Sequence, residues 1–118
     1  MVSLGAVAFT RDDVVTDTQV KPNPDQLAQS AQSAAGFLKT LAHEGRLMIL
    51  CHLGQGEMSV GALEETLGMR QAAVSQMLAR LRDEGLVATR RDGKTIYYSL
   101  ADERTRRMIA LLYEFYCG

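Results

Sequence analysis

The sequence predicts a mainly α-helical domain with one small β-hairpin, its elements in the order α-α-α-α-β-β-α. Two adjacent helical patterns and a hairpin pattern behind them predict this class. Residues 59–68 form a short amphipathic segment that ends in a glycine, which is typical of a helix with a C-terminal cap. In the segment that follows, Val74, Leu78 and Leu81 recur at positions i, i+4 and i+7, so one face of a longer helix is apolar.

A hairpin is predicted over residues 87–100, because β-branched and aromatic residues flank Asp92-Gly93, a dipeptide that favours tight turns. A short helix, a tight turn, a longer helix and a hairpin in this order make up a winged helix-turn-helix. In this arrangement the second helix enters the major groove of DNA.

The exposed face predicted for the longer helix suits a DNA groove. Its side chains are short or carry amides and hydroxyls, which are the groups that contact base edges. Cationic side chains at the hairpin tip can contact phosphates or enter the minor groove. The alternative is that this face is an ordinary solvated helix surface. The residues expected to contact double-stranded operator DNA are Ser59, Arg70, Gln71, Ala72, Ser75, Gln76, Arg80, Arg90, Arg91 and Lys94.

The distribution of charge supports this interpretation, although the net charge of the chain is only −1. Residues 70–94 carry six Lys or Arg against three Asp or Glu, whereas residues 1–25 and residues 26–69 each carry two against four. Positive charge is thus concentrated on the predicted DNA-binding unit. No stretch approaches the roughly 20 apolar residues of a membrane span, and the opening lacks the basic start of a signal peptide. We therefore expect a cytoplasmic protein that does not contact membranes.

The chain is expected to divide into a mobile N-terminal tail, residues 1–24, and one folded domain, residues 25–118. The tail has no hydrophobic period. Asp25 is expected to cap a first helix that runs to about Leu41. Asp102 is expected to cap the final helix.

The final helix carries more apolar residues than one core face requires, so we expect it to contact a second copy of the chain. Small side chains on the first helix would also allow close approach of a partner helix. The alternative is a monomer in which the final helix is wrapped by the rest of the chain. The residues expected at the homodimer interface are Leu38, Met108, Leu112 and Phe115.

Three stretches resemble the ArsR family of bacterial dimeric repressors: FLKTLAHEGRLMILCHL, SVGALEETLGMRQAAVSQMLARLRDEGLV and RRDGKTIYYSL, which fall within about residues 35–100. The resemblance implies a dimer built from the first and last helices, an operator with inverted symmetry, and an inducer that releases the DNA. Many members sense metals through a Cys-x-Cys before the recognition helix, but Ser59 and Gly61 occupy those positions here. Others use His ligands on the last helix, and no His follows His52. We expect neither a metal nor a cofactor.

Cys51 and Cys117 remain as candidates for an inducer site. Taken by themselves, they are more simply interpreted as two unrelated, inert thiols. However, a Cys in RLMILCHL and another in the terminal YEFYC resemble the dithiol pattern of the sulfide- and persulfide-responsive branch of the family, the SqrR and BigR repressors. The resemblance implies that the reduced protein binds DNA. It also implies that reactive sulfur species link the two cysteines within a subunit, which derepresses genes that handle sulfide.

Such a switch needs one thiolate to attack and a second to resolve. A helix C-terminus disfavours a thiolate, so we expect Cys51 to be more acidic than Cys117, with Arg46 and His52 as possible tuning groups. A metal-responsive or general thiol-oxidation repressor on the same scaffold stays open. A thiol oxidoreductase is disfavoured, because the chain has no Cys-x-x-Cys. We find no phosphate loop and no set of nucleophile and base, and therefore expect no enzyme.

Overall fold

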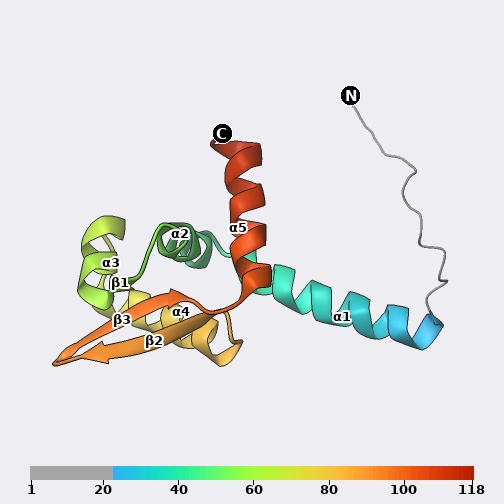
Figure 1. Ribbon diagram of the computed structural model, residues 1–118, viewed down its shortest axis with the longest axis horizontal. Helices are drawn as coiled ribbons and strands as arrows, with labels where there is room; N and C mark the ends of the chain where they lie inside the picture. Colours follow the sequence, from blue (N-terminus) through green and yellow to red (C-terminus); the bar gives the residue numbers. More distant parts are fainter. Residues whose placement is uncertain (1–22) are drawn as a thin grey trace. The chain divides into compact units, whose positions relative to one another are not determined.

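The computed structural model describes residues 23–118 of the chain (Figure 1). The chain divides into two compact units with the boundary between Gly36 and Phe37. Helix α1 (Pro24–Leu41) begins in the first unit, and its last turn belongs to the second, which holds every other described element. The tail predicted over residues 1–24 lies almost entirely outside the described residues, so its mobility stays a prediction.

Helix α1 begins two residues earlier than a cap at Asp25 would place it. The side chain of Asn23 accepts a hydrogen bond from the backbone N–H of Asp25 at 2.7 Å, and Pro24 is the first helical residue. The prediction of Asp25 as the cap is therefore wrong. Pro24 suits the first helical position because its missing N–H would have no partner there in any case. Asp25 instead lies in the first turn, where its negative charge is favourable.

Helix α2 (Glu44–Leu53) lies at the centre of the second unit and packs on α3, α4, β3 and α5. The side chain of His43 caps its start by accepting from the N–H of Arg46, and Gly54 follows its last residue. Apolar side chains cover more than one side of α2, and Ile49 and Leu50 are fully buried. A helix contacted from several sides needs such a composition.

Helices α3 (Val60–Leu67) and α4 (Gln71–Asp83) form the predicted helix-turn-helix. Ser59 Oγ accepts from the N–H of Ala62 at 3.1 Å and caps α3. Gly68 ends the helix in the left-handed conformation, with a φ of 65°, which a residue without a Cβ adopts at little cost. The predicted apolar stripe of α4 is confirmed, because its members are fully buried: Val74, Leu78 and Leu81. The hydrophobic effect of this stripe fixes which face of α4 points outward.

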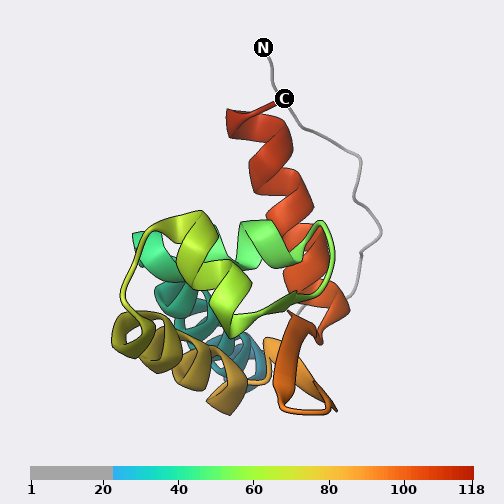
Figure 2. The ribbon, with the colours of Figure 1, turned by 90° about the vertical axis from the view of Figure 1, so that its left-hand side faces the viewer.

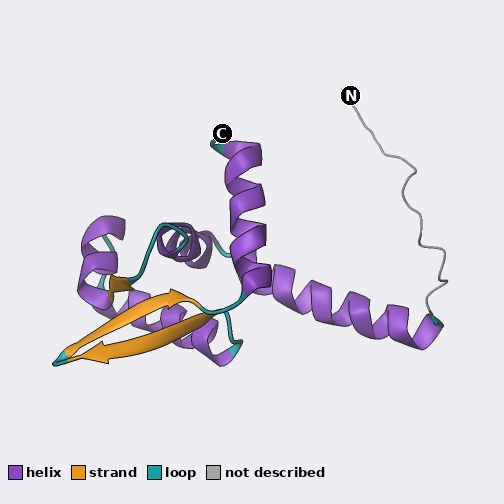
Figure 3. Ribbon diagram, viewed as in Figure 1, coloured by secondary structure: helices purple, strands orange, loops and turns teal. Residues whose placement is uncertain are grey.

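The sheet has three antiparallel strands in the order β1-β3-β2: β1 (Met58–Ser59), β2 (Val87–Asp92) and β3 (Thr95–Leu100). Strands β2 and β3 form the predicted hairpin, called the wing below (residues 87–100), with Asp92 paired to Thr95 across a two-residue loop. Strand β1 was not predicted, because two residues are too few to show a period. Apart from β1, the predicted element order is confirmed. Figure 3 shows that the sheet is small beside the helices.

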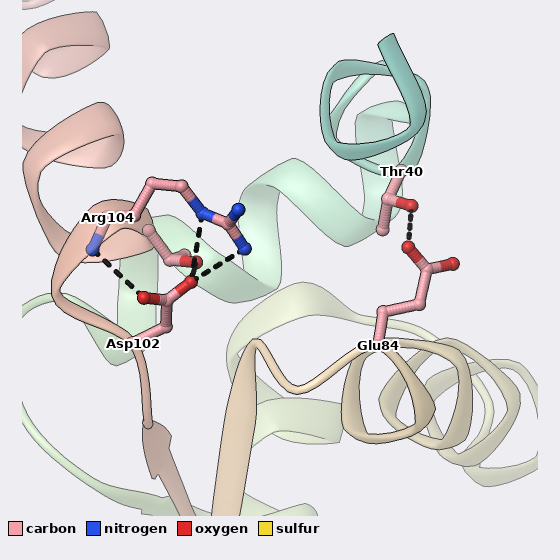
Figure 4. Close-up of polar contacts among 5 residues, drawn as sticks. Thr40, Glu84, Asp102 and Arg104 are labelled. Carbon is pink, nitrogen blue, oxygen red and sulfur yellow. Dashed lines mark hydrogen bonds and ion pairs between the residues drawn. The ribbon is translucent and has the colours of Figure 1, made fainter. Parts of the chain in front are cut away.

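Helix α5 (Glu103–Tyr116) starts as predicted at Asp102, whose side chain accepts from the N–H of Arg104 at 3.1 Å. The same carboxylate pairs with the Arg104 guanidinium at 3.0 Å (Figure 4). That guanidinium lies 4.3 Å from the ring centre of Phe37, in the last turn of α1. Ile109 buries the inner face of α5 in the core. In the described residues no helix is long and apolar enough to cross a membrane.

Candidate functional site

The outward face of α4 carries the predicted DNA-contacting residues of the helix. All of them are exposed, together with the residue before the helix: Arg70, Gln71, Ala72, Ser75, Gln76 and Arg80. Because the opposite face is fully buried, this helix cannot turn its polar face inward without losing the core. The face is therefore presented rigidly to whatever binds it.

Arg80 forms an i to i+4 ion pair with Glu84, the C-cap residue of α4. Glu84 also accepts a hydrogen bond from the Thr40 hydroxyl in the last turn of α1 (Figure 4). Hydrogen bonds from Thr40 and then Arg80 lower the pKa of Glu84 below its ordinary value. The guanidinium of Arg46 in α2 donates to the Thr40 carbonyl at 2.8 Å. The C-terminal end of α4 is thus tied to both α1 and α2.

The wing carries three of the predicted cations, and they differ in their surroundings. Arg90 pairs with Glu57 and lies 4.7 Å from the ring centre of Tyr97. The hydrogen bond between Arg90 and Glu57 raises the pKa of the arginine and lowers that of the carboxyl. Arg90 therefore braces the wing against the loop before β1. Arg91 and Lys94 are exposed and form no ion pair within residues 23–118, so they are the better placed to meet phosphates.

Ser59 is half-buried and has a structural role as the cap of α3. In that bond its oxygen is the acceptor, so its O–H can still donate to a phosphate. A contact from Ser59 to DNA is therefore compatible with its place in the fold.

Helix α4 and the wing lie together at one end of the second unit, and the C-terminal end of α5 lies at the other (Figures 1 and 2). Strand β2 packs directly against α4. The structure thus brings the polar face of a helix and the cationic tip of a hairpin to the same end, as a groove-binding helix and a backbone-binding wing require.

The two cysteines are free thiols on neighbouring helices. Cys51 is half-buried on α2, and Cys117 is exposed directly after the last residue of α5. Partial burial raises the pKa of the Cys51 thiol, and the negative charge of a Cys117 thiolate raises it further. Both effects act against the acidity that was expected of Cys51. The cysteines are 66 positions apart in the sequence, and the packing of α2 on α5 brings together the helix of Cys51 and the helix that Cys117 follows.

A cavity of about 450 Å³ opens beside Cys51 where the end of α2 meets α5. Its walls are Cys51, Gly54 and Gln55 from the α2 side, and Arg106, Ile109, Ala110 and Tyr113 from α5. Sequence reasoning missed this cavity. The spacing i, i+3, i+4 and i+7 of the α5 residues places them on one helix face and could have identified them as a set. That Cys51 lies across the cavity from them follows only from the fold.

Metal-ligating side chains do not gather in the part of the chain that the structure describes: no three of its His, Cys, Asp and Glu residues are grouped to hold an ion. Cys51 and Cys117 together offer two sulfurs. A structural zinc site commonly requires four ligands, and a catalytic one three.

The predicted dimer residues lie on accessible apolar surface. Leu38 is 52% exposed and Phe115 is 65% exposed, while Met108 and Leu112 are half-buried. Further apolar side chains are exposed along α5: Leu111, Tyr113 and Tyr116. Several large apolar side chains exposed on one helix favour a contact with another chain.

We predict that replacing Cys117 by Ser lowers the pKa of Cys51. A neighbouring thiolate disfavours a second negative charge, so its removal shifts the midpoint of Cys51 ionisation down, while burial keeps it above that of a free thiol. The pH dependence of Cys51 alkylation by iodoacetamide, followed by peptide mass spectrometry, measures this midpoint. Cys117→Asp is the control, because it keeps a negative charge and should keep the midpoint high. Equal midpoints in the two variants would show that the cysteines are not coupled.

Comparison with known proteins agrees with this architecture. Residues 43–89 match the family model for bacterial regulatory proteins of the arsR family. The biofilm growth-associated repressor (BigR) of Agrobacterium fabrum is 48% identical over 92 residues, which cover 78% of this chain and 79% of that protein.

Solved structures give the same result. Reduced HlyU from Vibrio cholerae superposes with a TM-score of 0.77 at 41% identity and covers 80% of this chain and 99% of its own. The homodimeric winged helix-turn-helix DNA-binding domain of Mb0332 from Mycobacterium bovis gives a TM-score of 0.69 at 35% identity and covers 81% and 89%. These relatives are transcriptional regulators, which confirms the expectation of a regulator and not an enzyme. The chain belongs to the ArsR family of bacterial regulatory proteins.

Proposed function

We propose that this chain is a homodimeric repressor that binds operator DNA in its reduced form. Release follows when a persulfide or polysulfide links Cys51 to Cys117 within a subunit, which derepresses genes that handle sulfide. The observation that carries the proposal is the position of the two thiols, Cys51 on α2 beside a cavity and Cys117 directly after α5, the helix that packs on α2. The names of relatives support it: one is a repressor, one is a homodimeric DNA-binding domain, and one has a reduced form.

DNA binding rests on α4 and the wing. In this proposal Gln71 and Ser75 contact base edges from the first turns of α4, and Arg91 and Lys94 contact the phosphate backbone. Arg80 would contact DNA while remaining held by Glu84, because a guanidinium has donors for more than one acceptor.

Dimerisation rests on the apolar surface of α5 and the end of α1. Two copies joined there would present two recognition helices, so that the pair binds an operator with two half-sites. The spacing of those helices then depends on how α5 is held against α2.

The proposed chemistry proceeds in balanced steps. The Cys51 thiolate attacks the sulfane sulfur of a persulfide RSSH, and the S–S bond breaks with RS⁻ as the leaving group, which leaves a persulfide on Cys51. The same reaction at Cys117 gives a second persulfide. The anion of one then attacks the inner sulfur of the other and expels HS⁻, which forms a trisulfide. The organic persulfide is the oxidant and is reduced to thiol and sulfide.

A polysulfide link is favoured over a direct disulfide because it spans a wider range of distances between the two cysteines. A direct disulfide requires Cα atoms about 4.4–6.8 Å apart and a narrow dihedral angle. Each added sulfur lengthens the link by roughly 2 Å and adds a rotatable bond. A chain of up to four sulfurs therefore joins α2 to the end of α5 over a wider range of separations. Since α2 also packs on α4, such a link would reposition the recognition helices and weaken operator binding.

We predict that an organic persulfide links Cys51 to Cys117 readily and that hydrogen peroxide does so poorly. Intact-mass measurement of the reduced protein, before and after each reagent, should show added sulfur within a monomeric subunit only for the persulfide. Cys51→Ser and Cys117→Ser should bind the operator normally and remain bound when persulfide is added.

Three outcomes separate the alternatives. Release of the Cys117→Ser variant by persulfide would overturn the proposed link. Equal formation of a plain disulfide by peroxide would support a general thiol-oxidation repressor. Stoichiometric release of the unmodified protein by a metal ion would support a metal-responsive repressor.

We predict that α4 and the wing contribute differently to DNA binding. Gln71→Ala should weaken operator binding by roughly 1–3 kcal/mol and change binding to random DNA little, because it removes a contact to a base edge. Lys94→Ala should weaken binding to all sequences and reduce the salt slope by about one. Fluorescence anisotropy on operator and random duplexes across a salt series measures both. An equal loss on both duplexes for Gln71→Ala would assign it to the phosphate contacts.

We predict that Phe115→Glu converts the dimer to a monomer. The side chain is largely exposed in one chain, so the substitution spares the core, but a charge buried in an apolar contact without a partner is costly. Sedimentation velocity measures the mass, and circular dichroism checks that the helices remain. Gln76→Glu on the opposite end is the control and should stay dimeric. A folded Phe115→Glu dimer of unchanged affinity would remove this part of α5 from the interface.

A further inference from the structure

The cavity beside Cys51 carries a positive charge that the chemistry of the thiols does not use. Arg106 lines it from α5, while Cys51 lines it from α2. We propose that Arg106 binds the carboxylate of an organic persulfide, so that the site favours carboxylate-bearing persulfides of amino acids and small peptides over neutral ones. This inference rests on the proposed function of the two cysteines.

The guanidinium of Arg106 is oriented before any ligand arrives. One terminal nitrogen donates to Glu103 Oε1 at 3.1 Å, and the other donates to the Leu100 carbonyl at 3.2 Å. Arginine has five N–H donors, so these two bonds leave donors that can meet a carboxylate as a fork. The side chain is 52% exposed and thus open to a solute. A fixed and accessible guanidinium is well suited to bind a planar anion.

The size of the cavity suits an organic molecule. At about 450 Å³ it lies within the roughly 300–1,000 Å³ of small-molecule sites. An inorganic hydrogen disulfide would fill little of it. Ile109, Ala110 and Tyr113 provide an apolar and aromatic wall for the carbon part of a ligand, and Gln55 provides an amide from the α2 side.

Charge explains why an arginine is useful here. The thiolate of Cys51 is already disfavoured by burial and by Cys117. A carboxylate entering the same cavity would add another negative charge. Arg106 neutralises that carboxylate, so the Cys51 thiolate can attack the sulfane sulfur without facing a further unpaired negative charge. The leaving group is RS⁻, and the carboxylate that Arg106 binds is part of its R group.

The test compares persulfides with and without a carboxylate on the full-length reduced protein. The reagents are cysteine persulfide, glutathione persulfide and 2-hydroxyethyl persulfide, and the rate of sulfur addition is followed by intact mass. In the Arg106→Gln protein, both carboxylate-bearing reagents should react roughly five to ten times more slowly, as the loss of a partly solvated charged hydrogen bond predicts. The rate with 2-hydroxyethyl persulfide should stay unchanged. Whichever of cysteine persulfide and glutathione persulfide loses more of its rate in Arg106→Gln is the reagent whose carboxylate Arg106 binds better.

Two further variants sharpen this test. Arg107→Gln is the matched control, because Arg107 is the next residue but lines a groove on another face of α5, and it should react like the unmodified protein. Arg106→Lys keeps the charge without the fork and should restore part of the rate. The ratio of rates within one variant is insensitive to a change in folding.

An equal slowing of all three reagents in Arg106→Gln, or no slowing, would overturn the role of Arg106 while leaving the cysteine link intact. Failure of the unmodified protein to react with any persulfide would instead overturn the proposed function, and this inference with it.

Discussion

The burial of α2 is the constraint on which the rest of the second unit depends. Ile49 and Leu50 are fully buried, and α2 packs on α3, α4, β3 and α5. Cys51 follows directly, so the thiol is attached to the helix that supports both the DNA-binding end and α5. A change at this thiol therefore acts on a helix that packs on both α4 and α5, and a cavity beside Cys51 admits the reagent that would cause it. The polar network from Arg46 through Thr40 to Glu84 adds a second tie between α2 and α4.

Much of the fold was predictable because its determinants are local. The apolar stripe of α4 and the caps at Gly68 and Asp102 lie within a few residues of the helices that they shape, and each is confirmed. The misses have a common cause. Asn23 and Asp25 flank Pro24, both side chains can cap, and the choice depends on backbone geometry that the sequence does not display. Strand β1 exists only because β3 offers it a partner.

The sequence predicted which residues of the candidate site are accessible, but it did not predict which of them form ion pairs or how their pKa values shift. Arg90 and Arg91 are adjacent in sequence, yet one braces the wing against Glu57, 33 residues away, and the other is unpaired among the described residues. Likewise, the neighbours of Cys51 along the chain suggested acidification, whereas burial and Cys117 decide the direction of its pKa shift. Interactions across large sequence separations fixed these properties, and composition does not show them.

The position of Cys117 just beyond α5 has a thermodynamic consequence. A covalent link from there to Cys51 would close a loop of 66 residues that contains α3, α4, the wing and all of α5. Closing a loop of that length removes conformational entropy from the unfolded chain, by roughly 4 kcal/mol in the chain-entropy treatment. The proposed inducer would therefore lower the affinity for operator DNA and, in the same reaction, raise the free energy of unfolding of the subunit. The linked subunit, which does not bind DNA, would then be more stable than the reduced one. Derepression would therefore persist after the persulfide is gone, until a reductant breaks the link.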